Sequence, residues 1–182
     1  MPSEAVYWAI LTAIAQDQQR LLEEAKAVEA QVRYAHFEAR DRSQRSEWGS
    51  YLPYIRQLAS GVGCAWAVLE FYGPQTKRKM RLQEFGRRGK WRYAATQFPE
   101  AKEWEIDEII RAEDAFEKIR RRTAFLSKIV QTVKGTGSAE GVKFSVPKPS
   151  TDASAGSTEV YQSVLEGRVP PWAGRADEGR RE

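Results

Sequence analysis

Histidine and cysteine, the side chains that most often carry covalent or metal chemistry, occur once each in this chain of 182 residues. His36 lies beside Phe37, and Cys64 lies within an apolar run. A zinc site would have to be built mostly from carboxylates, which is uncommon, and a Ser-His-Asp or Cys-His site would depend on His36 alone. We therefore predict no metal site and no catalytic site, and we interpret His36 as a surface or packing residue.

Phosphate-binding loops and paired acids give no stronger sign of catalysis. The run Gly135-Thr136-Gly137 is too short for a phosphate-binding loop and lacks its Lys-Ser/Thr ending. Paired acids such as Asp107 and Glu108 are plentiful, but they alternate with Lys and Arg, where solvated salt bridges are the ordinary explanation. We therefore expect a protein that is not an enzyme and that carries no cofactor.

A block of basic residues is the strongest functional signal in the sequence. Residues 77–92 contain eight Lys and Arg against Glu84 alone, a net charge of +7, whereas the whole chain carries +4. Such a block is typical of a surface that binds a polyanion, although a charge run can also be a solvated loop. Phe85, Trp91 and Tyr93 alternate with the basic residues. Such rings either stack on bases or anchor the segment to the core. The pattern indicates nucleic acid without separating RNA from DNA.

The expected phosphate contacts are basic side chains of this block and, secondarily, two arginines from a smaller cluster further along the chain. They are Lys77, Lys79, Arg81, Arg87, Arg88, Lys90 and Arg92, together with Arg121 and Arg122. Their attraction to phosphates would be independent of base sequence and sensitive to salt.

Helices are expected to position these residues. Apolar or small residues recur at steps of three and four from Ile10 to Ala39, with Asp17 as the one polar break, which predicts a long helix that begins near Ser3 and ends near residues 42–46. Steps of three and four from Leu52 to Leu69 predict a second helix, with Ser50 as its cap and Pro53 in its first turn. Its glycines, Gly61 and Gly63, would allow another backbone to pack closely.

The remainder of the chain continues this pattern. The basic block is expected to form two short helices joined by a turn at residues 86–89, followed by an acidic helix at 102–110 and a last helix from Asp114 to Gly135. The predicted fold is therefore all-α, a compact helical bundle at residues 1–135. Residues 136–182 are rich in Gly, Ser and Pro and are expected to be a flexible tail. Residues 160–165 are a candidate docking motif, either helical or extended, and Val169-Pro-Pro-Trp172 resembles a peptide that binds in a groove.

The compartment is expected to be the cytoplasm. One cysteine allows no disulfide framework, which fits a reducing environment. Glu4 precedes the first apolar stretch, which is not the pattern of a signal peptide. No apolar run approaches the roughly 18 residues of a membrane span.

Residues 48–72 carry a family pattern. Ser50-Tyr51, Leu52-Pro53, Gly61-Val62-Gly63 and Ala67-Val68-Leu69 stand in the order of an aromatic start, a Leu-Pro pair, a Gly-Leu-Gly-like element and an apolar run. This segment resembles the signature of the small helical subunit of type III-B CRISPR RNA-targeting complexes, and the resemblance covers residues 15–135. It implies a non-catalytic subunit that stacks along a ribonucleoprotein filament beside other subunits and contacts guide and target RNA.

Two alternatives belong to other classes. Residues 111–115, Arg-Ala-Glu-Asp-Ala, and Gly135-Thr-Gly-Ser138 resemble a helix and loop of the coat proteins of rod-shaped plant viruses, which also stack along RNA. The third interpretation is a protein-interaction adaptor without nucleic acid, in which the basic block binds an acidic partner.

Overall fold

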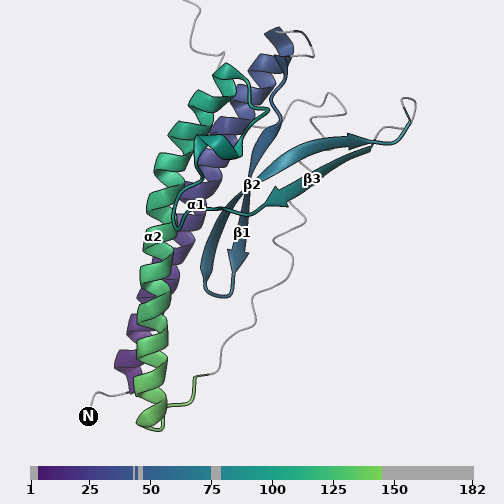
Figure 1. Ribbon diagram of the computed structural model, residues 1–182. Coiled ribbons are helices and arrows are strands. Elements are labelled where there is room, and N and C mark those ends of the chain that lie inside the picture. The colour runs from purple at the N-terminus through teal and green to yellow at the C-terminus, as the bar shows by residue number, and fades with distance from the viewer. Residues whose placement is uncertain (1–3, 43, 45–46, 75–78, 145–182) are drawn as a thin grey trace, which may run out of the picture. The chain divides into compact units, whose positions relative to one another are not determined.

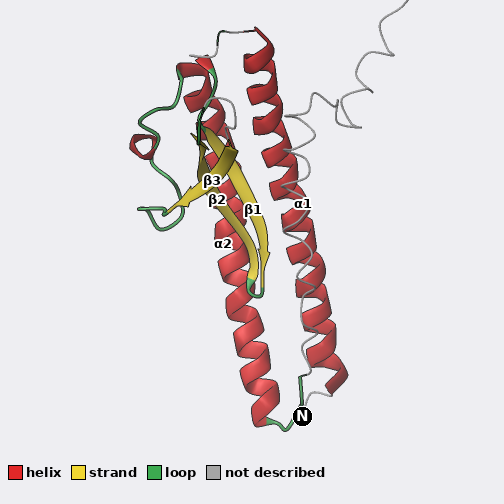
Figure 2. Ribbon diagram, turned by 90° about the vertical axis from the view of Figure 1, so that its right-hand side faces the viewer, coloured by secondary structure: helices red, strands yellow, loops and turns green. Residues whose placement is uncertain are grey.

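Two long helices frame the structure, which is a computed structural model (Figure 1). Helix α1 spans Glu4–Arg42 and helix α2 spans Glu103–Ala139. They run antiparallel and lie side by side in both views (Figures 1 and 2). The structure describes residues 4–42, 44, 47–74 and 79–144. The expected segments at 160–165 and 169–172 lie outside these residues, and the division at residue 135 stays a prediction.

An apolar stripe on each helix explains their pairing. Ile14, Leu21 and Val32 are among the buried residues of α1, and Ile109 and Phe116 are among those of α2. The prediction of the long first helix and of its end near Arg42 is confirmed. The acidic helix and the last helix are one continuous helix, however, and this helix passes through Gly135. Packing of a long apolar stripe outweighs the cost of about 1 kcal/mol for each of the helical glycines Gly135 and Gly137.

A three-stranded antiparallel sheet occupies the segment between the helices in sequence. Its strands are β1 (Tyr51–Leu58), β2 (Gly61–Tyr72) and β3 (Lys79–Phe85), in the order β1-β2-β3, and a short helix, η3, spans Ala95–Gln97. The all-α prediction is therefore wrong, because the second expected helix is a β-hairpin and the first short basic helix is a strand. The fold is mixed α and β.

The hairpin follows from a period of two that the spacing of three and four concealed. Val62, Cys64 and Trp66 alternate along β2 and join the buried cluster that the helices contribute to. Pro53, which has no N–H to donate, lies on β1, an edge strand. Trp66 packs edge-on against Phe98 and Phe116, and it is completely buried. The indole thereby joins sheet, loop and helix in one core.

Gly61 is required by the tight turn between β1 and β2. Its φ is +131°, a conformation that side chains with a Cβ rarely adopt, and a Cβ there would lie 2.6 Å from Cγ2 of Thr123. We expect Gly61→Ala to lower the free energy of unfolding by about 1–3 kcal/mol, measured by urea denaturation. Gly86→Ala is the matched control, because a Cβ there meets no atom within 4 Å. Equal losses in the two variants would contradict this role.

A buried carboxylate joins the start of the sheet to α2. Oε1 of Glu105 accepts hydrogen bonds from the backbone N–H groups of Ser50 (2.8 Å) and Tyr51 (2.6 Å), and Oε2 accepts one from Lys102 (3.2 Å). Nε2 of His36, from α1, lies 3.4 Å from Oε1. Burial raises the pKa of Glu105 and lowers the pKa of His36 to about 4. Three elements therefore meet at one titratable pair.

The low pKa of His36 predicts acid sensitivity. Between pH 6.5 and pH 4 the histidine is protonated in the unfolded chain, where its pKa is near 6.5, but not in the folded chain. The free energy of unfolding therefore falls as the pH drops from about 6.5 toward 4. Lowering the pH from 7 to 5 should decrease the free energy of unfolding by about 2 kcal/mol through His36 alone. Glu105 acts in the opposite sense, because its raised pKa favours the folded state on acidification. We expect His36→Gln to lose less stability than the wild type between pH 7.5 and pH 5 in urea titrations. A loss as large as that of the wild type would contradict the assignment.

Candidate nucleic-acid interface

The predicted phosphate-contacting residues lie on three parts of the structure, namely a strand, a helix and a loop. Lys79 and Arg81 lie on β3, and Arg121 and Arg122 lie on α2. Arg87, Arg88, Lys90 and Arg92 belong to the segment between β3 and η3, which we call the basic loop (residues 86–92). Lys77 lies outside the described residues. The loop was expected to continue into a second short helix, but residues 86–94 contain no helix.

A buried ion pair on α2 holds the C-terminal part of the basic loop. Nη2 of Arg120 lies 2.8 Å from Oε1 of Glu113, and the two side chains are 5% and 1% exposed. Nη1 of Arg120 donates to the carbonyl of Trp91 (2.8 Å), and Nε donates to that of Cys64 (3.0 Å). Glu113 also accepts from the indole N–H of Trp66 and from the backbone N–H of Tyr93. This pair therefore ties the loop to the helix and to β2.

Gln97 holds the N-terminal part of the loop from η3. Its Nε2 donates to the carbonyl of Gly86 (3.0 Å), and its Oε1 accepts from the backbone N–H groups of Arg88 and Ala94 (both 3.3 Å). A Cβ on Gly89 would lie 2.7 Å from the carbonyl oxygen of Arg92, so the loop is too tightly folded there for a larger residue. The backbone of the loop is therefore fixed at both ends.

Three cations of the basic loop form no ion pair with a carboxylate among the described residues. Nε of Arg87 donates to the carbonyl of Gly89 (3.0 Å), Arg88 is exposed, and Nζ of Lys90 lies 5.3 Å from the centre of the Trp91 ring. A rigid loop with three such charges suits an extended anion, because little conformational freedom is lost when phosphates bind.

The four other predicted arginines are paired within the protein. Arg81 pairs with Glu70 (2.7 Å), Arg92 with Asp114 (2.5 Å), Arg121 with Glu117 (2.6 Å) and Arg122 with Asp17 (2.8 Å). The pair with Arg122 lowers the pKa of Asp17. The block therefore does not act as one continuous positive surface. Arg121 still lies beside the loop, with its guanidinium 5.6 Å from the centre of the Trp91 ring.

The aromatic residues of the block mostly serve the core. Tyr93 is 4% exposed and donates its hydroxyl to the carbonyl of Phe85 (3.1 Å), and burial raises its pKa. Phe85 packs edge-on against Tyr93 and Phe98. Of the three rings that alternate with the cations, Trp91 is left at the loop surface, between Lys90 and Arg121.

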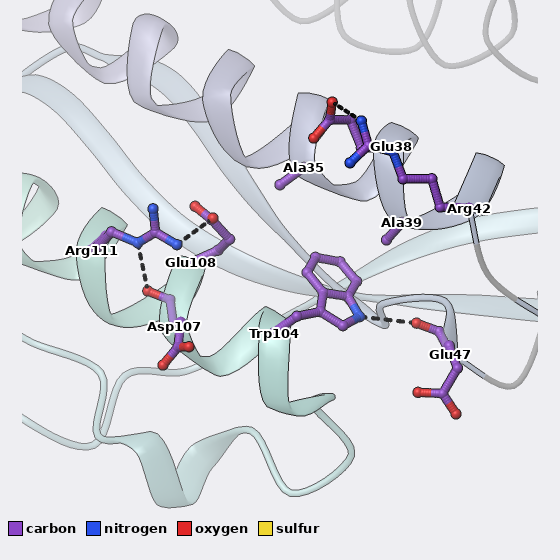
Figure 3. Close-up of a pocket in the computed structure, with 9 residues that line it drawn as sticks. All are labelled: Ala35, Glu38, Ala39, Arg42, Glu47, Trp104, Asp107, Glu108 and Arg111. Atoms are coloured by element: carbon purple, nitrogen blue, oxygen red, sulfur yellow. Dashed lines mark hydrogen bonds and ion pairs between the residues drawn. The ribbon is translucent and has the colours of Figure 1, made fainter.

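A shallow groove of about 450 Å³ lies between the end of α1 and the start of α2 (Figure 3). Trp104 stands in its centre and donates its indole N–H to the carbonyl of Glu47 (3.0 Å). On its walls Arg42 pairs with Glu38 (3.0 Å) and Arg111 with Glu108 (2.5 Å). The lining residues are Ala35, Glu38, Ala39, Arg42, Glu47, Trp104, Asp107, Glu108 and Arg111. Because its arginines are already paired, we assign no ligand to the groove.

Groups suited to metal or thiol chemistry do not gather in the described part of the chain. Among those residues, no three His, Cys, Asp or Glu side chains lie close enough together to hold a metal ion. Burial raises the pKa of Cys64 to about 12, so its thiol stays protonated at neutral pH. None of the described helices has the length and apolar character needed to cross a membrane.

Glu113, Arg120 and Gln97, which hold the basic loop, were not predicted as site residues from the sequence. A signal did exist, because Glu113 and Arg120 share the spacing of the inward residues Phe116 and Thr123, at steps of three and four. Charged residues on such a stripe are buried only when paired. Gln97 offered no comparable signal, since its partners are backbone groups of the loop.

Comparison with known proteins places the chain in a family. A family model described as MobI protein matches residues 21–134, well over half of the chain. The chain belongs to the MobI protein family. In this MobI protein the match includes both helices in large part, the whole sheet and the basic loop. No curated protein and no solved structure matches the chain.

Membership in MobI, a mobilisation-related family, corrects the earlier interpretation. The resemblance to type III-B CRISPR small subunits is wrong, and so is the predicted role in a CRISPR ribonucleoprotein that contacts RNA. The coat-protein alternative has no support either. The physical reason lies in residues 48–72, since a resemblance that treats them as a helix cannot hold for residues that form β1 and β2.

Proposed function

We propose that this MobI protein acts in plasmid mobilisation as a non-catalytic accessory protein that binds duplex DNA through the basic loop. The family points to mobilisation of a plasmid, and a plasmid is a duplex DNA molecule. The observation that carries the proposal is the fixed basic loop, with Arg87, Arg88 and Lys90 free of carboxylate partners among the described residues. A duplex presents phosphates at regular spacing, and such a loop can neutralise several of them.

The experiment is a salt titration of binding. The full chain is mixed with a fluorescently labelled 30-base-pair duplex, and anisotropy is recorded between 50 and 200 mM NaCl. Each phosphate contact contributes a slope of about −0.9 to log K against log salt, so three loop contacts predict a slope near −3 or steeper. Absence of binding at 50 mM salt, or binding that salt leaves unchanged, would overturn the proposal.

A transfer experiment in cells tests the biological part of the proposal. Loss of the chain should lower the frequency at which its plasmid is mobilised, and expression of the wild-type chain should restore it. An unchanged frequency after loss of the chain would contradict a role in mobilisation.

A further inference from the structure

The end of the β2–β3 hairpin projects beyond the rest of the sheet. The register of β1 with β2 ends at the pair Tyr51 and Val68, and the N–H of Leu69 bonds to the carbonyl of Ser50 (2.8 Å). Beyond this point β2 pairs with β3 alone, at residues 70–72 and 79–81, which we call the ribbon arm. Figure 1 shows these strands leaving the helices. A two-stranded ribbon is one of the elements that the major groove of DNA admits.

One face of the ribbon arm carries polar side chains. Successive strand residues point to opposite faces, so Glu70 and Tyr72 on β2 share a face with Lys79 and Arg81 on β3. Gln83, opposite Val68 at the base of the arm, lies on the same face. Nε of Arg81 donates to Oε2 of Glu70 (2.8 Å), and Nη2 donates to Oε1 of Gln83 (3.1 Å). The Arg81 guanidinium lies 5.8 Å from the centre of the Tyr72 ring. The Arg81 side chain is nevertheless 60% exposed.

The chemistry of this face fits base edges better than phosphates. Arginine forms paired hydrogen bonds to guanine, glutamine forms them to adenine, and a glutamate accepts from cytosine. Glu70 repels phosphates and at the same time orients the Arg81 guanidinium. In the basic loop, which follows directly after β3, Arg87, Arg88 and Lys90 have no such carboxylate partner among the described residues. The two surfaces therefore differ in the kind of DNA contact they suit.

We propose that the ribbon arm lies in the major groove of duplex DNA and that Arg81, together with Gln83 at the base of the arm, contacts base edges there, while the basic loop contacts phosphates. The inference rests on the proposed function and adds to it a means of recognising sequence. Phosphate contacts position a protein on DNA, whereas base contacts select the sequence.

The experiment selects sequences from a random pool of 30-base-pair duplexes with the full wild-type chain. We expect enrichment of one motif. The double variant R81A/Q83A should bind the unselected pool within about twofold of the wild type, but its preference for the selected duplex should fall by roughly tenfold to a hundredfold. R56A is the matched control, because Arg56 forms a similar exposed pair with Glu84 (2.9 Å) on the opposite face of the sheet. Its preference should stay unchanged.

The outcomes separate the two proposals. If the wild type binds the pool but enriches no motif, or if R81A/Q83A keeps the wild-type preference, the ribbon arm does not read bases and the proposed function stands. If the wild type binds no duplex at all, both proposals fail. Replacing guanine by 7-deazaguanine in the selected duplex should weaken wild-type binding, because the N7 acceptor of the major groove is lost. Unchanged binding there would overturn the major-groove placement.

Discussion

Replacing Arg120 with methionine is expected to lower the free energy of unfolding by about 3–5 kcal/mol. The substitution leaves the Glu113 carboxylate, which is 1% exposed, without its cation, and it frees the carbonyls of Cys64 and Trp91. A buried charge without a partner costs far more than an exposed one. Urea denaturation followed by circular dichroism measures the loss.

Arg121→Met is the matched control for this prediction. Arg121 is the next residue along the chain, but its side chain is 58% exposed and its pair with Glu117 lies at the surface. Exposed pairs contribute at most about 1 kcal/mol. The double variant E113L/R120M should lose less stability than the sum of the single variants, since it removes both charges together. Equal losses for the two arginine variants would show that Glu113 and Arg120 are not coupled in a buried pair.

The second large effect concerns DNA affinity. The triple variant R87A/R88A/K90A should fold normally and bind a 30-base-pair duplex with a salt slope shallower by about 2.7, which is three contacts at about 0.9 each. Its affinity at low salt should fall about a hundredfold, at roughly 1 kcal/mol for each lost contact. These side chains form no ion pair with a carboxylate among the described residues, so stability should change little.

A second triple variant, which loses the same amount of positive charge elsewhere in the protein, controls for long-range electrostatic attraction to DNA. R20A/K26A/R42A removes three exposed cations from α1, which contributes no residue to the basic loop. It changes the net charge by the same amount, so a general electrostatic effect would lower DNA affinity equally in both triple variants. A loss confined to the loop variant would assign the contacts to Arg87, Arg88 and Lys90. Equal losses would contradict that assignment.

The helices could be predicted from the sequence, whereas the sheet could not. The apolar spacing from Ile10 to Ala39 fits only a helical period. From Leu52 to Leu69 the apolar residues satisfy steps of three and four as well as alternation, and the turn at Ala59 and Ser60 lacks the Asn-Gly or Asp-Gly pair that marks a hairpin. Gly61 was the useful clue, because a positive φ at a turn explains it better than a helix interior does.

The sequence shows where the cations of the candidate site are concentrated, but it does not show which of them form ion pairs with carboxylates. The count of cations in residues 77–92 identified a concentration of charge that includes the basic loop. Which cations have carboxylate partners depends on tertiary contacts, since Arg92 pairs with Asp114 on α2 and Arg122 pairs with Asp17 on α1. Sequence separations of this size carry no local signal.

The most direct test of a DNA-binding basic loop is to map the binding surface by NMR. Backbone amide shifts of the ¹⁵N-labelled chain are recorded as an unlabelled 14-base-pair duplex is added. We predict that the amide signals of Arg87, Arg88 and Lys90 shift when the duplex is added, while those of the residues lining the groove around Trp104 do not. Shifts that cluster around Trp104 and spare residues 86–92 would contradict it.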